Sequence, residues 1–594
     1  MDKLKNMDIL KNSKIYRACL YIFPLILLLY PLRHINMGLD LADTGYNYAN
    51  FRYSGLEHMD SMWFFSTYLA NVTGHILTLL PGGHTLIFMN LYTALLVSAL
   101  ALISYRFLAK RLEIPELIVF TGELMAISLC WSPTAVLYNY MTYLFFLVGI
   151  LLVYEGLTQE KEIYLIIAGA ALGTNIFVRF SNLPEAGLIV AVWAYGGICH
   201  KKIKKVMQET GFCLLGYVGA VILWLGYISL RYGFMSYVEG IRRLFAMTEN
   251  AADYKASSML YGVFSDYIQN LYWLNRILIF MVPSVIACFL FPKSWKWIKR
   301  LICIFFSAAA IVWLYSKNCF NFQFNSDGAI YRLGIVFLML TIFVCILRIF
   351  SKKTEKNEKL LAVMIILALF ISALGSNNRL LTSINNLFLA LPYVLWNVYR
   401  LCRKNDMRLF AVKAMGAAFL CLFCVQSVGF GIGYVFVESE RDKAMDSKVE
   451  NNAVLKGIYT SSDRAEQMKE LSAYVSDKNL AGREVILYGE IPALSFYLEM
   501  PSCFNPWSDL ASYSEETMAA AFDALKREIS EGKELPVVIL SHDTDVYAAE
   551  DAMKATKLSL ILDYMEEYGY AETFSNQKFI LYEAEKMNIS GRVD

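Results

Sequence analysis

The chain has 594 residues, of which 57% are hydrophobic, 14% aromatic and only 18% charged. This apolar fraction is far above that of soluble proteins and predicts a chain that buries most of its length in a lipid bilayer. The net charge of +2 comes with no basic patch typical of nucleic-acid-binding proteins. The 12 cysteines show neither metal-binding pairs nor the spacing of a secreted disulfide framework, so we expect no zinc site and no disulfides.

The N-terminal segment, residues 1–17, is basic and leads into a long Leu-rich run that lacks a small-residue cleavage site, which indicates an uncleaved first span. Further apolar runs of roughly the length that crosses a bilayer follow it, giving about 13 predicted transmembrane helices. The runs begin near Ile15, Thr85, Leu117, Tyr138, Ile163, Pro184, Gly211, Leu271, Leu301, Ala329, Leu360, Ser383 and Ala411.

Positive charge in alternate loops sets the predicted orientation in a cell membrane. The basic loops contain Lys110 and Arg111, Lys161, Lys201 to Lys205, Lys293 to Arg300, Lys352 to Lys359, and Arg403 to Arg408. By the positive-inside rule these loops and the N-terminus are cytoplasmic. The loops 33–84 and 231–270 and the C-terminal region are then outside. A span at Trp63 to Leu80 would invert this pattern, so that stretch is predicted to be an interfacial helix.

The chain changes character at Glu438, where charged residues become frequent and strand-like and helical patterns alternate. We expect helices at Ser462 to Asp477 and Leu558 to Tyr568, and strands at Glu484 to Tyr488, Pro536 to Leu540 and Lys578 to Glu583. The predicted fold is therefore an α-helical multi-pass membrane protein, residues 1–437, with a C-terminal extracytoplasmic α/β domain, residues 438–594.

The first outer loop contains two carboxylates, Asp40 and Asp43, among glycines and aromatic residues. A carboxylate held at the membrane surface can take a proton from a hydroxyl or amine nucleophile. The alternative is a solvated loop in which Asp and Gly only form turns.

The first outer loop follows a basic N-terminus and one span, and it contains Asp43-Thr44-Gly45-Tyr46. This arrangement resembles the acidic motif of GT-C glycosyltransferases, the superfamily of protein O-mannosyltransferases and aminoarabinose transferases. The number of spans and the outer C-terminal domain fit the same layout. The resemblance implies that Asp43 is the catalytic base, with Asp40 as the alternative because Thr44 replaces a second acid. It also implies that Tyr46, and with it Tyr48, contacts substrate. No cofactor is predicted; a divalent metal is possible, but no ligand set supports one.

The resemblance further implies a sugar donor linked to a polyprenyl phosphate and an acceptor on the outer face. Phosphate departs as a stable anion, so a single carboxylate is sufficient where a glycosidase needs two. Arginines would bind that phosphate. Five arginines lie on the predicted outer side: Arg179, Arg242, Arg243, Arg332 and Arg379. Arg179 and Arg379 directly follow apolar runs and are the first candidates, although snorkelling to headgroups explains any single one equally well.

Other features leave alternatives open. The loop 231–270 either folds over the site or is an ordinary surface loop. Glu123 lies inside an apolar run and should have a hydrogen-bond partner. The aromatic stretch Asn505 to Asp509 is either a sugar-binding surface or part of a domain core.

The sequence therefore predicts a membrane glycosyltransferase whose acceptor is an unknown glycan, lipid or protein. A lipid-linked glycan flippase or transporter is one alternative, but no internal repeat of the kind found in transporters is seen. A glycan polymerase or ligase is the other, and it would not depend on a carboxylate in the first loop.

Overall fold

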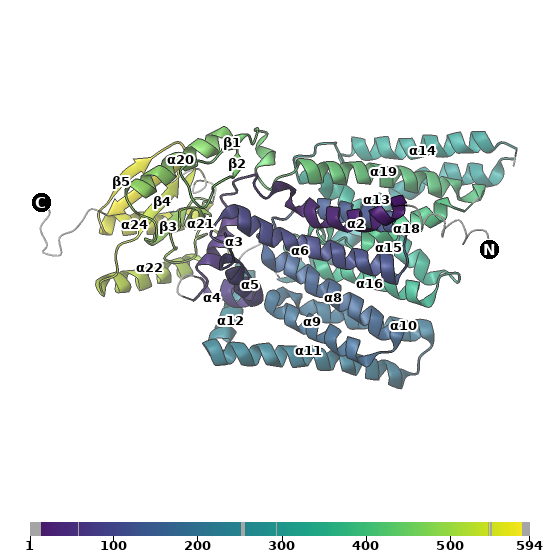
Figure 1. The fold of residues 1–594 in the computed structure, drawn as a ribbon, viewed down its shortest axis with the longest axis horizontal. Helices are drawn as coiled ribbons and strands as arrows, with labels where there is room; N and C mark the ends of the chain where they lie inside the picture. Colours follow the sequence, from purple (N-terminus) through teal and green to yellow (C-terminus); the bar gives the residue numbers. More distant parts are fainter. Residues whose placement is uncertain are drawn as a thin grey trace, which may run out of the picture.

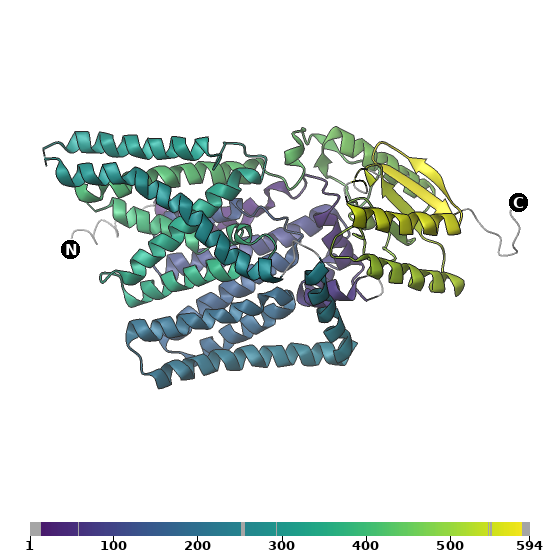
Figure 2. The ribbon, with the colours of Figure 1, turned by 180° about the vertical axis from the view of Figure 1, so that it is seen from behind.

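In the computed structural model, residues 14–584 are described except for 57–58, 251–255, 293, 405, 545, 547–548 and 550. A bundle of long helices lies beside a smaller domain made by the C-terminal part of the chain (Figure 1). Helix α2 begins at the end of the bundle far from that domain and runs towards it, and the reverse view shows the same arrangement (Figure 2).

The bundle is built from apolar helices in both halves of the membrane region. In the first half they are α2 (Lys14–Leu29), η1 (Tyr30–His34), α6 (Leu86–Arg106), η2 (Phe107–Arg111), α7 (Glu116–Ser128), α8 (Leu137–Gln159), α9 (Glu162–Val178), η3 (Phe180–Ile189), α10 (Val190–Cys199) and α11 (Ile203–Tyr232). In the second half they are α13 (Ala256–Leu290), α14 (Lys296–Ser316), α15 (Gly328–Phe350), α16 (Lys356–Ala373), α17 (Leu380–Ile384), α18 (Ala390–Cys402), η5 (Met407–Leu409) and α19 (Phe410–Gly433).

Every predicted apolar run falls on helix. Within the described residues, seven helical stretches are long and apolar enough to cross a membrane: Leu86–Arg111, Leu137–Gln159, Ile203–Tyr232, Met259–Leu290, Lys296–Ser316, Gly328–Phe350 and Met407–Gly433. The other predicted runs form shorter or interrupted helices in the same bundle. The run at Pro184 divides into η3 and α10, and the run at Ser383 divides into α17 and α18. Apolar periodicity finds such segments but does not show where a helix breaks.

The outer surface of the bundle is apolar, as a lipid-facing surface must be. Helix α11 exposes Leu215, Ile222 and Leu230, and α14 exposes Phe305 and Val312. The protein is thus a helical, multi-pass membrane protein.

Four further helices lie at the end of the bundle that faces the C-terminal domain: α3 (Asp43–Arg52), α4 (Ser61–Ser66), α5 (Tyr68–Thr78) and α12 (Phe234–Asn250) (Figure 1). The stretch predicted as one interfacial helix is two short helices, α4 and α5, which meet at Thr67. The first loop, the start of the 231–270 segment and the C-terminal domain therefore gather at one end, as the positive-inside pattern predicts. The centre of that long segment, residues 251–255, lies outside the described residues.

The C-terminal domain contains a four-stranded sheet in the order β3-β4-β6-β5, in which β3 and β4 are parallel and the other pairs antiparallel. Its elements are η6 (Ser439–Arg441), β1 (Ser447–Lys448), β2 (Tyr459–Thr460), α20 (Ser462–Asp477), β3 (Val485–Tyr488), α21 (Leu494–Tyr497), α22 (Glu515–Ser530), β4 (Val537–Ser541), α24 (Ala552–Glu567), β5 (Tyr570–Ser575) and β6 (Phe579–Ala584).

Alternate residues of the central strands pack against helices on the two faces of this sheet. Val485 and Leu487 belong to the core shared with α20, whereas Ile486 and Tyr488 belong to the core formed with α22 and α24. The two predicted helices and three predicted strands of this domain are present: α20 begins at its expected residue, the strands begin one residue later than expected, and α24 begins six residues earlier. The sequence did not predict α22, β5 or the two-residue strands β1 and β2.

Candidate functional site

The acidic first loop is attached to the C-terminal domain by backbone hydrogen bonds. The Gly38 N–H donates to the Tyr459 carbonyl over 2.8 Å, and the Tyr459 N–H donates to the Asn36 carbonyl over 2.9 Å. One residue further on, the Leu39 N–H donates to the Glu438 carboxylate over 3.2 Å. Arg464 holds that same carboxylate at 2.7 Å and also donates to the Leu39 carbonyl. Strand β2 and the residues around it thus fix the path of the loop.

Helix α21 holds the next part of the loop. The Tyr497 hydroxyl donates to the Asp40 carbonyl over 2.6 Å, and the Ala493 N–H donates to the Leu41 carbonyl over 3.0 Å. Gly45 makes close packing possible, because a Cβ atom added there would lie 2.2 Å from the Ala493 Cβ. A glycine is therefore required where α3 crosses α21.

Asp40 is a structural carboxylate at the start of α3. Its side chain is buried and accepts hydrogen bonds from the Ala42 N–H at 2.9 Å and the Thr44 N–H at 2.7 Å. Burial raises the pKa of Asp40, and the hydrogen bonds from Thr44 and Ala42 act in the opposite direction. This arrangement satisfies N–H groups that the first turn of a helix leaves unpaired. Each Asp40 carboxylate oxygen therefore already accepts one backbone hydrogen bond.

Asp43 differs from Asp40 in each of these respects. It is the first residue of α3 and half-buried, and within the described part of the chain its carboxylate has no hydrogen-bond or ion-pair partner. Burial, and then the nearby charge of Asp40, raise the pKa of Asp43 to about 7. A carboxylate with a near-neutral pKa and free oxygens is suited to general-base chemistry. The structure therefore favours Asp43 over Asp40 for that role.

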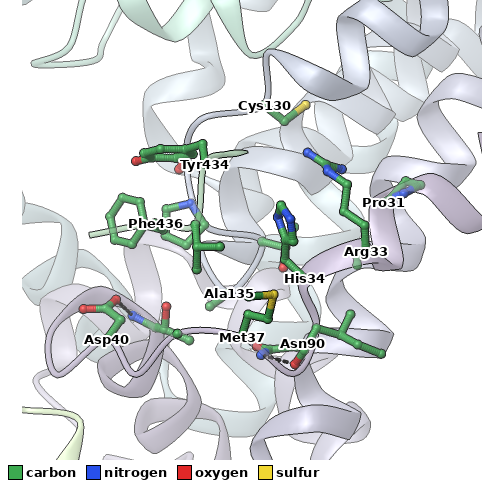
Figure 3. A pocket seen from close by; sticks show the side chains of 18 of the residues that line it. Pro31, Arg33, His34, Met37, Asp40, Asn90, Cys130, Ala135, Tyr434 and Phe436 are labelled. Atoms are coloured by element: carbon green, nitrogen blue, oxygen red, sulfur yellow. Dashed lines mark hydrogen bonds between the residues drawn. The ribbon is translucent and has the colours of Figure 1, made fainter. Parts of the chain in front are cut away.

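A polar cavity of about 150 Å³ lies beside this loop (Figure 3). Asp40 and Thr44 line it from the loop, and Arg33 and His34 line it from η1. Figure 3 shows Arg33 on the opposite side of the cavity from Asp40. The Arg33 guanidinium donates to the Gly431 carbonyl and lies 4.3 Å from the Tyr30 ring centroid. Asp43 itself is not part of the wall of this cavity.

A second cavity, the arginine cavity, has a volume of about 290 Å³ and contains Arg179 in its wall. The Arg179 guanidinium donates to the Asn139 side chain at 3.2 Å and lies 5.2 Å from the Tyr138 ring centroid. Within the described residues no carboxylate neutralises it. Trp63 also lines this wall, but its indole N–H is buried and lacks a hydrogen-bond acceptor within the described residues. A guanidinium without an anionic partner, among apolar side chains such as Phe245, is suited to an anionic lipid headgroup.

The two cavities are neighbours along the chain. Ala135 lines the polar cavity, Tyr138 lines the arginine cavity, and Asn139 accepts the hydrogen bond from Arg179. Asn139 follows Ala135 by four positions, so the chain between them spans at most about 14 Å. The acidic loop and Arg179 therefore lie at the same end of the bundle.

The other four predicted arginines differ in their surroundings. Arg379 forms an ion pair with Asp266 at 3.2 Å. Its loop reaches the arginine cavity, where the Gly375 carbonyl accepts from Arg179 at 3.5 Å. Arg242 is exposed beside Glu239 at 3.2 Å. Arg243 lies between Asp60 at 3.7 Å and Glu239 at 3.8 Å.

Arg332, the fifth, is exposed and donates to the Lys317 carbonyl at 3.0 Å. It lines neither cavity of the candidate site. Of the five arginines predicted from the sequence, only Arg179 combines a place in the wall of a candidate-site cavity with the lack of a carboxylate partner among the described residues.

The two predicted substrate-binding tyrosines have separate environments. Tyr48 is fully buried, donates to Asn90 at 2.9 Å and packs on Phe496 with ring centroids 5.6 Å apart. The expectation that Tyr48 contacts substrate is corrected: it is a core residue between α3, α6 and α21. Tyr46 is on the face of α3 that also carries Asp43, and its ring meets Trp507 edge-on at 5.4 Å. The aromatic stretch Asn505 to Asp509 thus approaches the acidic loop.

Glu123 is fully buried in α7. Within the described residues, the Ser104 hydroxyl of α6 lies near enough to interact with its carboxylate, although that hydroxyl donates its hydrogen bond to the Phe388 carbonyl over 2.8 Å. The same part of the chain contains no group of three or more His, Cys, Asp or Glu residues that could hold a metal ion.

Sequence reasoning missed Arg33, Tyr497 and Arg464. Arg33 could have been noticed as the last cation before the acidic loop. The other two come from the C-terminal domain, and no local signal connects them to a loop more than 400 residues earlier. Trp507 lies in the aromatic stretch that the sequence did single out, but its contact with Tyr46 could not be predicted.

No protein-family model matches the chain, and no curated protein matches it. Among solved structures, the chain is similar to the archaeal oligosaccharyltransferase AglB from Archaeoglobus fulgidus in complex with an inhibitory peptide and a dolichol-phosphate. The identity is 14%, the TM-score 0.40, and the match covers 98% of this chain and 75% of that one. It is also similar to ArnT from Cupriavidus metallidurans in the apo state, with 12% identity, a TM-score of 0.36 and coverage of 95% and 97%.

Proposed function

We propose that this protein is a membrane glycosyltransferase that moves a sugar from a polyprenyl-phosphate donor to an acceptor on the outer face of the membrane. The observation that carries the proposal is Asp43: a half-buried carboxylate without a partner in the described residues, whose pKa is raised to about 7. In this reaction an acceptor hydroxyl or amine attacks the anomeric carbon of the sugar. Asp43 takes the proton of the nucleophile as the new bond forms.

The leaving group accounts for the second half of the site. The bond between the anomeric carbon and the phosphate oxygen breaks, and its electron pair stays on the polyprenyl phosphate. Arg179 would hold that dianion through its planar guanidinium. The apolar wall of the arginine cavity, including Leu260, suits the first isoprene units.

Tyr46 and Trp507 support a place for the acceptor. Both aromatic rings lie on the side of α3 that carries Asp43, and aromatic faces bind the apolar surfaces of sugars and peptides. The basic loops at the far end of the bundle support an orientation in which this site is extracytoplasmic.

The test is transfer from a mixed pool of radiolabelled polyprenyl-phosphate sugars, with the protein in nanodiscs. We expect Asp43→Asn to reduce transfer by roughly 100-fold or more, the usual contribution of a general base. The matched control is Asp446→Asn, which changes an exposed carboxylate just before β1. This variant should transfer at the wild-type rate.

Two outcomes overturn the proposal. If both Asp40→Asn and Asp43→Asn transfer at the wild-type rate, no carboxylate of the first loop is the base, and a polymerase or ligase that relies on arginines is the better explanation. If the wild type transfers from no donor but moves lipid-linked substrate across the bilayer, the protein is a transporter.

A further inference from the structure

A third cavity, the inner cavity, lies between α13, α15, α18 and α19 and has a volume of about 480 Å³. Its wall is apolar over most of its area and includes Leu278, Phe343, Val398 and Phe419. It shares no lining residue with the polar cavity or the arginine cavity. It is therefore a separate space, larger than either cavity of the candidate site.

The inner cavity lies in the half of the bundle far from the C-terminal domain. Helix α19 ends at Gly433, next to that domain, and the part of α19 that lines the cavity is its first half, from Val412 to Leu420. The C-terminal ends of α15 and α18 reach the cavity, at Ser351 and Lys404 respectively. This is the side of the predicted cytoplasmic, basic loops.

Three cations line the same cavity: Arg348, Arg400 and Lys404. Arg348 and Arg400 share one carboxylate, Glu358, at 2.7 and 2.9 Å. The Lys404 ammonium is exposed and has no carboxylate partner among the described residues. Three cations thus face one carboxylate, a formal excess of two positive charges.

The position of Arg400 is fixed from a second side. Its guanidinium lies 4.4 Å from the Trp396 ring centroid, a cation–π contact that holds it at the mouth of the apolar space. Snorkelling alone would carry a long cationic side chain away from an apolar wall into the headgroup layer. Here the cations border a cavity whose interior is wide enough for a hydrocarbon chain.

We propose that the inner cavity is a binding site for an anionic glycerophospholipid of the leaflet on the N-terminal side. One acyl chain occupies the apolar space, and the phosphate is held by Arg400, Lys404 and Arg348. Basic pockets between helices on the cytoplasmic side recognise anionic headgroups in this way. The site is independent of the proposed transfer reaction, whose cavities lie at the other end of the bundle.

The test is lipid titration of the delipidated, full-length protein in a neutral detergent, followed by native mass spectrometry. The probes are dioleoyl-phosphatidylglycerol and dioleoyl-phosphatidylcholine, which differ in headgroup charge but not in chains. We expect phosphatidylglycerol to bind on the order of tenfold more tightly, as two excess charges imply. Equal binding of both lipids would overturn the proposal.

Two sets of variants locate the site. Lys404→Gln, alone and with Arg400→Gln, should remove the preference, whereas Lys352→Gln with Lys353→Gln, exposed cations at the same end, should keep it. Gly416→Leu should weaken both lipids by filling the cavity, while Gly416→Ala, whose Cβ lies 3.7 Å from Val398, should not. A preference that survives Lys404→Gln with Arg400→Gln, or an undiminished affinity in Gly416→Leu, would exclude this cavity. Polyprenyl phosphate that displaces phosphatidylglycerol from wild type but not from the Lys404→Gln variant would assign it to the donor lipid instead.

Discussion

The Tyr497 hydroxyl donates a hydrogen bond to the backbone carbonyl of Asp40 over 2.6 Å, across 457 residues of sequence. Through this bond, and through the contact of Ala493 with Leu41, the C-terminal domain holds the acidic loop that starts α3. The C-terminal domain thus helps to hold the candidate site in place.

Replacing Tyr497 by Phe should loosen this loop. The change leaves the buried Asp40 carbonyl without its donor, and an unsatisfied buried group costs about 1–3 kcal/mol. We expect a lower melting temperature in detergent and slower transfer, with little change in the donor KM because the arginine cavity is untouched. Tyr459→Phe is the control, since that side chain is partly exposed and only its backbone bonds to the loop. Equal melting temperatures for Tyr497→Phe and the wild type would show that the bond does not support the loop.

The pH dependence of transfer should follow Asp43. The base must be ionised, and the pKa of Asp43 is raised to about 7. The kcat/KM should therefore rise with pH up to about 7 and level off above it. A profile that is flat from pH 5 to 8 in the wild type would contradict Asp43 as the base.

The raised pKa of Asp43 also predicts how the stability of the folded protein changes with pH. The Asp43 carboxyl binds its proton more tightly in the folded protein than in the unfolded chain, so its contribution to stability is present at low pH and is lost as pH rises through about 7. Asp43→Asn removes the ionisable group, so the variant does not lose this stability at high pH. We expect the variant to melt at a higher temperature than the wild type at pH 8, with the gap closing towards pH 4. A variant that is less stable at pH 8 would show that Asp43 is paired and structural.

Arg179 should govern the affinity for the donor. Because hydrogen bonds to charged groups contribute about 1.5–3 kcal/mol, Arg179→Ala should raise the donor KM by roughly 10- to 100-fold. Arg179→Lys should recover only part of this, since an ammonium cannot bind phosphate bidentately. Arg332→Ala, in an exposed arginine outside both cavities of the candidate site, should leave the KM unchanged. If Arg332→Ala has the larger effect, the donor phosphate lies elsewhere.

Gly45→Ala should separate α3 from α21. The new methyl group would lie 2.2 Å from the Ala493 Cβ, and overpacking of this kind costs about 1–3 kcal/mol. The added Cβ would also lie 2.5 Å from the Ala493 Cα, which the double variant Gly45→Ala with Ala493→Gly retains, so this variant should regain only a small part of the stability and transfer. A Gly45→Ala variant that is as stable as the wild type would mean that the two helices do not meet there.

The sequence predicted what depends on local pattern. Helix α20 was expected at Ser462 to Asp477 and occupies those residues. Its amphipathic pattern and its boundaries depend only on the residues of this short segment. Asp43 and Arg179 stood out because charge beside an apolar run is rare. The different roles of Asp40 and Asp43 could not be predicted, since they depend on which carboxylate accepts the backbone N–H groups of α3.

Tyr48 shows what the sequence could not predict. The family resemblance implied that it contacts substrate, but α6 and α21 enclose it. Arg379 likewise stood out by its position, yet Asp266 from a separate helix neutralises it. Burial and pairing of this kind arise from tertiary packing, which residue type and spacing do not report.

The contact of Gly38 with Tyr459 and that of Asp40 with Tyr497 have a consequence for biosynthesis. The acidic loop emerges from the ribosome long before the residues that fix it, 457 positions later in the case of Tyr497. A nascent chain therefore lacks these contacts with its acidic loop until the last helix has been made and the following domain has folded. Under the proposed function, the order of translation itself would delay transfer from lipid-linked sugars until the chain is finished.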